Sequence, residues 1–253
     1  MIVAMHEALT QKEKRQVIGE HLRAMRKMLI VCVAAIAVAF LLIFYLFCTP
    51  LVDFILEPLR TRGIEVIATH VSESLIMKFK ACLVAAVVAA MPVIIWQIWS
   101  FVSPALYKQE KRLFRGLFFV ALLLFLLGVW FSYAFVFPLA IDLFYEAGEG
   151  LATTMWSVNQ YFDFVLSFVL PFGLMFEMPV VIFMLARRGK VTYAKLTKFR
   201  KYFILVVAVV AAVLTPPDVV SQIMLLIPLL ILYEISVLLA RFVKTTASKE
   251  AEA

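Results

Sequence analysis

Long apolar runs separated by short charged segments form the main pattern of this sequence. A helix needs about 20 apolar residues to cross the hydrocarbon core of a bilayer. Because backbone amides in lipid need internal partners, and the runs do not alternate as barrel strands do, they are predicted to be helices. The pattern thus predicts an all-α integral membrane protein with six transmembrane helices, at 28–47, 81–99, 116–137, 164–186, 202–214 and 219–240.

Composition supports a single membrane domain over residues 1–253, because 64% of the residues are apolar and only 16% are charged. Ordinary soluble domains carry about 25% charged residues. The first run begins at Met28 and ends at Cys48-Thr-Pro50, without a small-x-small cleavage site, so it is expected to be a retained helix. The three cysteines and three histidines show no metal-type spacing, and neither a metal nor a cofactor is expected.

The basic residues predict the orientation. Most of the 24 Lys and Arg residues precede the first run, follow the second or fourth run, or lie in the carboxyl-terminal tail. Cytoplasmic loops carry such an excess, so both termini are predicted to be cytoplasmic. The intervening segments are acidic. No basic cluster is interleaved with exposed aromatics, so nucleic-acid binding is not expected.

The last two predicted helices are short. Thirteen apolar residues at 202–214 reach about 20 Å, against a hydrocarbon core of about 30 Å. One interpretation is a hairpin that stops short of the outer surface, where the mismatch is relieved by thinning of the bilayer or by partners. The other is that Lys198–Tyr202 extends the helix while its cations reach the interface. The sequence leaves both open.

Four prolines lie inside the runs, at Pro92, Pro171, Pro179 and Pro228. Each removes a backbone donor and bends its helix. Bent helices pack poorly as a parallel bundle, so a curved wall with a concave face is predicted.

A few polar residues interrupt the runs. Glu177 stands near the middle of the fourth, where a charge costs on the order of 3 kcal/mol. It is either a neutral carboxyl hydrogen-bonded to a neighbouring helix or a functional group facing a cavity or partner. Glu234 in the sixth run and Gln97 in the second are milder cases.

Glu110 is the only acid in the cytoplasmic segment 107–112. A carboxylate accepts a guanidinium in a bidentate, directional pair. From spacing alone, a local ion pair with Lys111 or Arg112 is favoured over a recognition role.

Catalytic motifs are missing from the sequence. It contains no G-x-S-x-G, no H-E-x-x-H and no Walker loop, so an enzyme is not expected. The residues alone leave open a proton- or ion-coupled small-solute transporter with Glu177 as the coupling carboxylate, although no inverted repeat is evident.

Ordered motifs over most of the chain resemble those of TatC, the multispanning receptor of the twin-arginine protein translocase. They are His21–Arg23, Arg26, Glu57–Leu59, Pro92–Arg112, Phe137–Ala140, Phe172–Val180, Phe199–Tyr202 and Leu214–Gln222. The resemblance implies a receptor, in the bacterial inner membrane, for folded proteins whose signal peptide carries two adjacent arginines. It also implies single-span partners of the TatA and TatB type, association with further copies of itself, and transport driven by the proton-motive force.

The resemblance assigns roles to individual residues. Glu110 matches the carboxylate that contacts the arginine pair, which reverses the preference for a local ion pair. Phe101 and Gln97 match positions of the same patch, and Glu177 matches an intramembrane acid on the concave face. Polar positions where a partner helix is expected to dock complete the set: Thr215, Gln222 and Glu234.

One position departs from the family pattern. The amino-terminal motif of the family places a second arginine-contacting Glu where this chain has Ala24. Glu20 lies one helical turn earlier on the same face, and we hypothesise that it substitutes for the missing Glu. Arg26, in the same segment, is also expected to belong to the signal-peptide site. The alternative is that Ala24 weakens the site and Glu110 carries most of the binding.

Overall fold

The computed structural model describes residues 2–68, 70–102, 111–148, 155–214 and 219–243, and only their backbone at 2–18, 20–21, 102, 111–114 and 147. Nearly all of this described chain is helical. The helices are α1 (Ile2–Leu46), α2 (Cys48–Arg60), α3 (Glu73–Val102), α4 (Lys111–Phe131), α5 (Phe137–Gly148), α6 (Val158–Phe176), α7 (Met178–Arg187), α8 (Tyr193–Leu214) and α9 (Val219–Phe242). Two short strands, β1 (Glu65–Ile67) and β2 (Met155–Ser157), pair in parallel.

Five stretches of the described helices are long and apolar enough to cross a membrane: Leu22–Leu46, Glu73–Phe101, Arg115–Glu146, Val158–Arg187 and Val219–Phe242. The predicted helical membrane protein is therefore confirmed, with α8 as a further helix. Of the two interpretations for the fifth run, the structure favours extension, because α8 begins at Tyr193 and continues through the basic residues before Tyr202.

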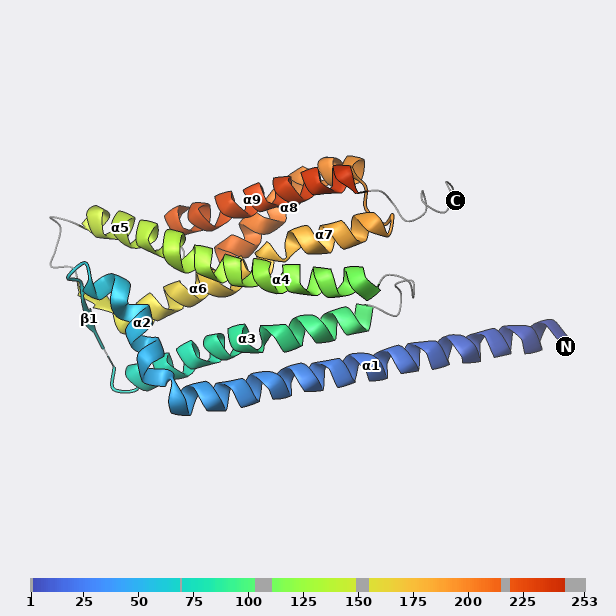
Figure 1. Cartoon of the computed structure of the whole chain (residues 1–253), viewed down its shortest axis with the longest axis horizontal. Coiled ribbons are helices and arrows are strands. Elements are labelled where there is room, and N and C mark those ends of the chain that lie inside the picture. Colours follow the sequence, from blue (N-terminus) through green and yellow to red (C-terminus); the bar gives the residue numbers. More distant parts are fainter. Residues whose placement is uncertain (1, 69, 103–110, 149–154, 215–218, 244–253) are drawn as a thin grey trace.

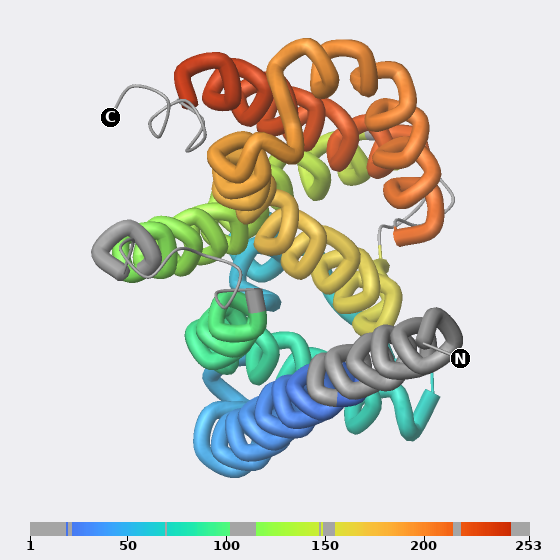
Figure 2. The backbone as a smooth tube through the Cα atoms, turned by 90° about the vertical axis from the view of Figure 1, so that its right-hand side faces the viewer, coloured from blue at the N-terminus to red at the C-terminus, as the bar shows by residue number. Residues whose placement is uncertain are grey.

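The helices form a curved layer (Figures 1 and 2). Helix α1 packs mainly on α3, and α3 packs on α4 and α6. Helices α6 and α7 pack on α9, which in turn packs on α8. Helices α1 and α8 therefore lie at opposite edges of the layer.

Two of the long spans are interrupted near prolines. A single π-helical turn, Ser132–Val136, joins α4 to α5 directly before Pro138, whose missing N–H cannot continue the α-helical ladder. Glu177 separates α6 from α7, next to Pro179 in the first turn of α7. The predicted third span at 116–137 is thus followed by a further helix, whereas α3 and α9 continue through Pro92 and Pro228.

Helices α4 and α6 approach closely through two glycines. A Cβ on Gly128 would lie 2.7 Å from the Phe172 carbonyl oxygen, and one on Gly173 would lie 2.6 Å from the Phe125 ring. Phe125 and Phe172 are fully buried at this crossing. Small residues allow such contact between helices where lipid supplies no hydrophobic driving force.

The end of the molecule formed by β1, β2, α2, α5 and the first turns of α3 and α6 is named here the strand end (Figure 1). At its centre, Glu73 is 6% exposed. Its carboxylate accepts hydrogen bonds from the His70 amide at 3.0 Å, the Ser157 hydroxyl at 2.7 Å and the Asn159 amide at 3.0 Å. Glu73 therefore ties the start of α3 to β2 and to the first turn of α6.

Helix α2 is fixed to the layer through its carbonyl groups. Pro58 lacks the N–H that would bond to the Phe54 carbonyl, and the Tyr133 hydroxyl donates to that oxygen at 2.8 Å instead. The Tyr161 hydroxyl donates to the neighbouring Ile55 carbonyl, also at 2.8 Å. Tyr133 thus supplies the bond that the proline removes, and Tyr161 adds a second bond to α2.

Candidate functional site

The end of the molecule opposite the strand end is named here the basic end. It carries Arg23, Arg26, Lys27, Arg115, the cations from Arg187 to Lys201, and Arg241. Arg23, Arg26 and Lys27 lie along the middle of α1, and the other cations lie at or near the starts of α4 and α8 and the ends of α7 and α9, which Figure 1 shows at one end of the molecule. The charge segregation predicted from the sequence is present in the fold.

Several predicted recognition residues lie in the helices that reach the basic end. Gln97 and Phe101 are in the last turns of α3, and both are partly buried. Arg26 is exposed on α1, which packs along α3. Glu20 belongs to α1, but its side chain lies outside the described part, and Glu110 lies outside the described residues altogether. Contact of these two acids with arginine stays a prediction.

Glu177 lines a cavity of about 330 Å³ between the last turns of α3 and the break between α6 and α7. Met91, Ile95 and Trp99 form its α3 wall, and Arg188 lies at the same cavity. Glu177 Oε1 is buried and accepts no hydrogen bond from any described residue. Of the two interpretations for this acid, the structure favours a group facing a cavity over a carboxyl bonded to a neighbouring helix.

The cavity walls include residues that sequence reasoning did not select. Met91, Ile95, Ile98 and Trp99 follow one another at helical spacing, so their shared face on α3 was readable from the sequence. Arg188 carried no comparable signal, because only the folded arrangement of the helices brings it to the cavity that Glu177 lines.

The residues predicted to dock a partner helix are used within the hairpin of α8 and α9. Gln222 Nε2 donates to the Ala208 carbonyl at 3.0 Å, and Arg200 Nη2 lies 2.7 Å from Glu234 Oε2. Thr215 lies outside the described residues. Gln222 and Glu234 thus connect α9 to α8, and their role toward a partner remains a prediction.

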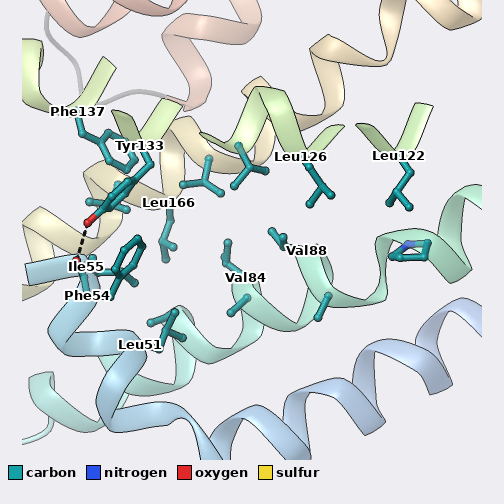
Figure 3. A pocket seen from close by; sticks show the side chains of 17 residues that line it. Leu51, Phe54, Ile55, Val84, Val88, Leu122, Leu126, Tyr133, Phe137 and Leu166 are labelled. Carbon is teal, nitrogen blue, oxygen red and sulfur yellow. Dashed lines mark hydrogen bonds between the residues drawn. The ribbon is translucent and has the colours of Figure 1, made fainter. Parts of the chain in front are cut away.

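A second, larger cavity of about 420 Å³ lies between α2, α3, α4 and α6 (Figure 3). Alanine and valine side chains of α3, among them Val84 and Val88, face Leu122 and Leu126 of α4 across it. Tyr133 contributes the one hydroxyl in its lining, and that group is directed to α2. An apolar chain fits this environment; a polar reaction centre does not.

Among the residues that the structure describes, no three His, Cys, Asp or Glu side chains are grouped to hold a metal ion. The fold defines a polytopic helical membrane protein with many cations at one end and an apolar cavity between α2, α3, α4 and α6.

Comparison with known proteins gives the family. Residues 20–228 match the family model of the Sec-independent protein translocase protein TatC. The chain is 37% identical to TatC of Carboxydothermus hydrogenoformans, over 92% of this chain and 96% of that protein. It is 36% identical to TatCy of Bacillus subtilis, over 92% of each chain. It is 39% identical to TatC of Aquifex aeolicus, over 92% of this chain and 98% of that protein.

A solved structure agrees. The crystal structure of a twin-arginine translocase receptor, TatC, superposes with a TM-score of 0.81 at 39% identity, covering 87% of this chain and 97% of that one. The chain therefore belongs to the TatC family. This is a family of protein translocase receptors and not of enzymes, as the missing catalytic motifs predicted.

Proposed function

We propose that this chain is the receptor subunit of a twin-arginine translocase and that it binds signal peptides with paired arginines at its basic end. The observation that carries the proposal is the placement of Gln97 and Phe101 at the end of α3, directly before the segment that contains Glu110. An acid in that segment would stand at a rim otherwise rich in cations, so it would offer an arginine pair a directional partner.

The apolar part of the signal peptide would then enter the layer of helices. The cavity of about 420 Å³ is lined by α3 and α4, the two helices that flank the Glu110 segment. Burying apolar side chains there contributes about 0.8 kcal/mol per CH₂ group. The arginines set specificity at the rim, and the apolar segment supplies most of the affinity.

The partners follow from the same proposal. We infer single-span subunits of the TatA and TatB type, with further copies of this chain, in a bacterial inner membrane with both termini in the cytoplasm. The hairpin of α8 and α9 supports docking of a partner helix, because the apolar part of α8 is short and Leu205, Val209 and Val213 are exposed on it. Docking of the peptide would alter contacts near Glu177 and this hairpin, and the proton-motive force would drive transport.

Crosslinking tests the receptor function. A photoreactive residue at position 110 is expected to crosslink to a twin-arginine signal peptide, and changing Arg-Arg to Lys-Lys in the peptide should abolish the product. Glu110→Gln should weaken peptide binding at least about tenfold, as loss of a bidentate charge pair does. The matched control is Glu65→Gln, at an exposed acid on β1 of the strand end.

Two outcomes would reject the proposal: crosslinks that persist with Lys-Lys, or equal effects of Glu110→Gln and Glu65→Gln. Unchanged peptide binding in Glu20→Ala would reject only the substitution of Glu20 for the missing family acid. A second function, a proton-coupled small-solute transporter, is favoured by Glu177 Oε1, which is buried at a cavity without a hydrogen-bond partner among the described residues. Solute flux in liposomes containing this protein alone, lost in Glu177→Gln, would support it instead.

A further inference from the structure

A third cavity, of about 560 Å³, lies beside α8 at the basic end. Its lining combines two lysines, Lys190 and Lys195, with the aromatic side chains of Phe199, Tyr202 and Tyr233. None of the residues assigned above to peptide binding or to partner docking lines it. The cavity therefore calls for its own explanation.

The lysine mouth of this cavity is built by a defined turn between α7 and α8. Gly189 adopts φ +69°, its amide bonds to the Ala186 carbonyl at 2.9 Å, and the Lys190 amide bonds to the Leu185 carbonyl at 3.0 Å. This pattern is a Schellman motif, which ends a helix on a glycine. Thr192 then caps α8 by accepting a bond from the Lys195 amide at 3.4 Å. Both lysines are thus carried on fixed backbone.

The floor of the cavity is also fixed. Tyr233 of α9 stacks on Phe203 with ring centroids 3.9 Å apart, and its hydroxyl donates to the Leu196 carbonyl at 2.8 Å. The nearby Arg200 is held by Glu234 at 2.7 Å, so this cation is directed to α9. A polar ligand at the cavity meets Lys190 and Lys195 instead.

The chemistry of the cavity changes along α8 from charged to apolar. Lys195, Phe199, Tyr202 and Val206 share one helical face, at spacings of four, three and four residues. Eleven residues of helix span about 16 Å. The side chains of Phe199, Tyr202 and Val206 are 58%, 52% and 58% exposed. The face therefore presents a cation at one end and an apolar track beyond it, as an amphiphile with an anionic head requires.

The local charge selects the sign of the ligand. From Arg187 to Lys201 the sequence holds seven cations and no acid. Within the described residues, Lys190 and Lys195 form no ion pair. Basic pockets at the cytoplasmic side of membrane helices suit anionic lipid head groups.

We propose that the cavity beside α8 binds one anionic glycerophospholipid of the leaflet at the basic end. The phosphate lies between the ammonium groups of Lys190 and Lys195, and one acyl chain follows Phe199 and Tyr202 to Val206. An acidic partner helix fits less well, because the face beyond Lys195 offers only the exposed apolar and aromatic side chains of Phe199, Tyr202 and Val206. The assignment does not depend on the proposed receptor function.

Native mass spectrometry of the detergent-purified full chain tests this site. The chain is titrated with phosphatidylglycerol and, separately, with phosphatidylcholine. K190Q/K195Q should bind phosphatidylglycerol about tenfold more weakly, because it removes both ammonium groups that hold the phosphate in the cavity. The matched control, K27Q/K198Q, removes the same charge at the same end without touching the cavity, and its affinity should stay within about twofold of the parent.

A third variant tests the apolar track. Val206→Trp keeps every charge and fills the groove, so phosphatidylglycerol binding should also fall, while glycerol 3-phosphate should not displace the bound lipid from the parent chain. The proposal is overturned if both lysine pairs lose affinity equally, if phosphatidylcholine binds as tightly as phosphatidylglycerol, or if glycerol 3-phosphate displaces the lipid. Thermal unfolding of each variant identifies any loss of fold, and the lysine pairs alone then decide the outcome.

Discussion

The strand end and the basic end of this molecule use their charges differently. At the strand end, Arg60 is paired with Asp53 at 2.9 Å, Arg62 with Asp142 at 2.6 Å, and Lys80 with Asp163 at 2.6 Å. The hydrogen bonds that the Arg62 guanidinium donates to Asp142 raise the pKa of this guanidinium. At the basic end, Lys190, Lys195 and Lys198 form no ion pair with any described residue.

The charges at the strand end stabilise the fold, whereas these three lysines at the basic end are available to bind ligands. Paired ions, a buried glutamate and two tyrosine hydroxyls connect segments far apart in sequence at the strand end. Cations with no partner within the described chain contribute little to that cohesion, and they are available to anionic groups from outside. We expect changes at the strand end to alter stability, and changes at the basic end to alter binding.

The largest loss of stability is expected from Glu73→Ala. The change leaves the Ser157 hydroxyl and the Asn159 amide without their buried acceptor, at a cost of about 3 kcal/mol. Thermal unfolding in detergent micelles measures it, with Glu65→Ala on exposed β1 as the matched control. If both variants unfold at the temperature of the parent, Glu73 does not hold the strand end.

A somewhat smaller loss is expected from Gly128→Ala, in the middle of the layer that both ends share. The new methyl group would meet the Phe172 carbonyl, and overpacking of this kind costs about 2 kcal/mol. Gly116→Ala on the same helix, where nothing lies near the added carbon, is the control. Hydrogen exchange should rise at both ends in Gly128→Ala; a rise at one end alone would contradict a shared core.

Tyr161→Phe is expected to cost about 1 kcal/mol, because it removes one buried hydrogen bond to the Ile55 carbonyl. The ring stays, so packing is preserved. Tyr145→Phe, at a residue that is 38% exposed, provides the comparison. Equal midpoints in denaturant for the two variants would mean that the tyrosine bond to α2 does not hold this helix in place.

The smallest loss in the free energy of unfolding is expected from Arg60→Gln. It should stay below about 0.5 kcal/mol, since exposed ion pairs contribute little to stability. Arg60 and Asp53 have side chains that are 58% and 51% exposed. Lys198→Gln at the basic end should fall in the same range. If Lys198→Gln lowered the free energy of unfolding by more than about 1 kcal/mol, this lysine would contribute to the fold and the contrast between the two ends would be wrong.

The apolar runs predicted the long helices because length and hydropathy decide a span regardless of tertiary contacts. Helix α2 escaped notice although its buried residues, Val52, Ile55, Leu56 and Leu59, repeat at helical spacing. That amphipathic signal lies outside the long runs. The pairing of β1 with β2 joins segments about 90 residues apart and left no local pattern.

The candidate site was predictable only where a residue contradicted its surroundings. Glu177 was selected because a carboxyl is costly in an apolar run, and it does lie at a cavity. Gln222 was selected because it matches a polar position of the family at this hairpin. Its bond to Ala208 could not be foreseen, since the register of α8 against α9 depends on packing. The cavity beside α8 was not predicted, because Lys190 and Lys195 were interpreted only as part of the positive charge that sets the orientation in the membrane.

The placement of α1 and α8 at opposite margins of the layer has a consequence for assembly. The apolar flanks of α1, such as Val33, Leu41 and Leu42, are more than half exposed, as are Leu205 and Val213 of α8. A further helix can pack on either edge of the layer without displacing a neighbouring helix, so the layer can be extended laterally. Such an addition leaves the existing contacts between helices intact, and it is reversed when the added helix dissociates.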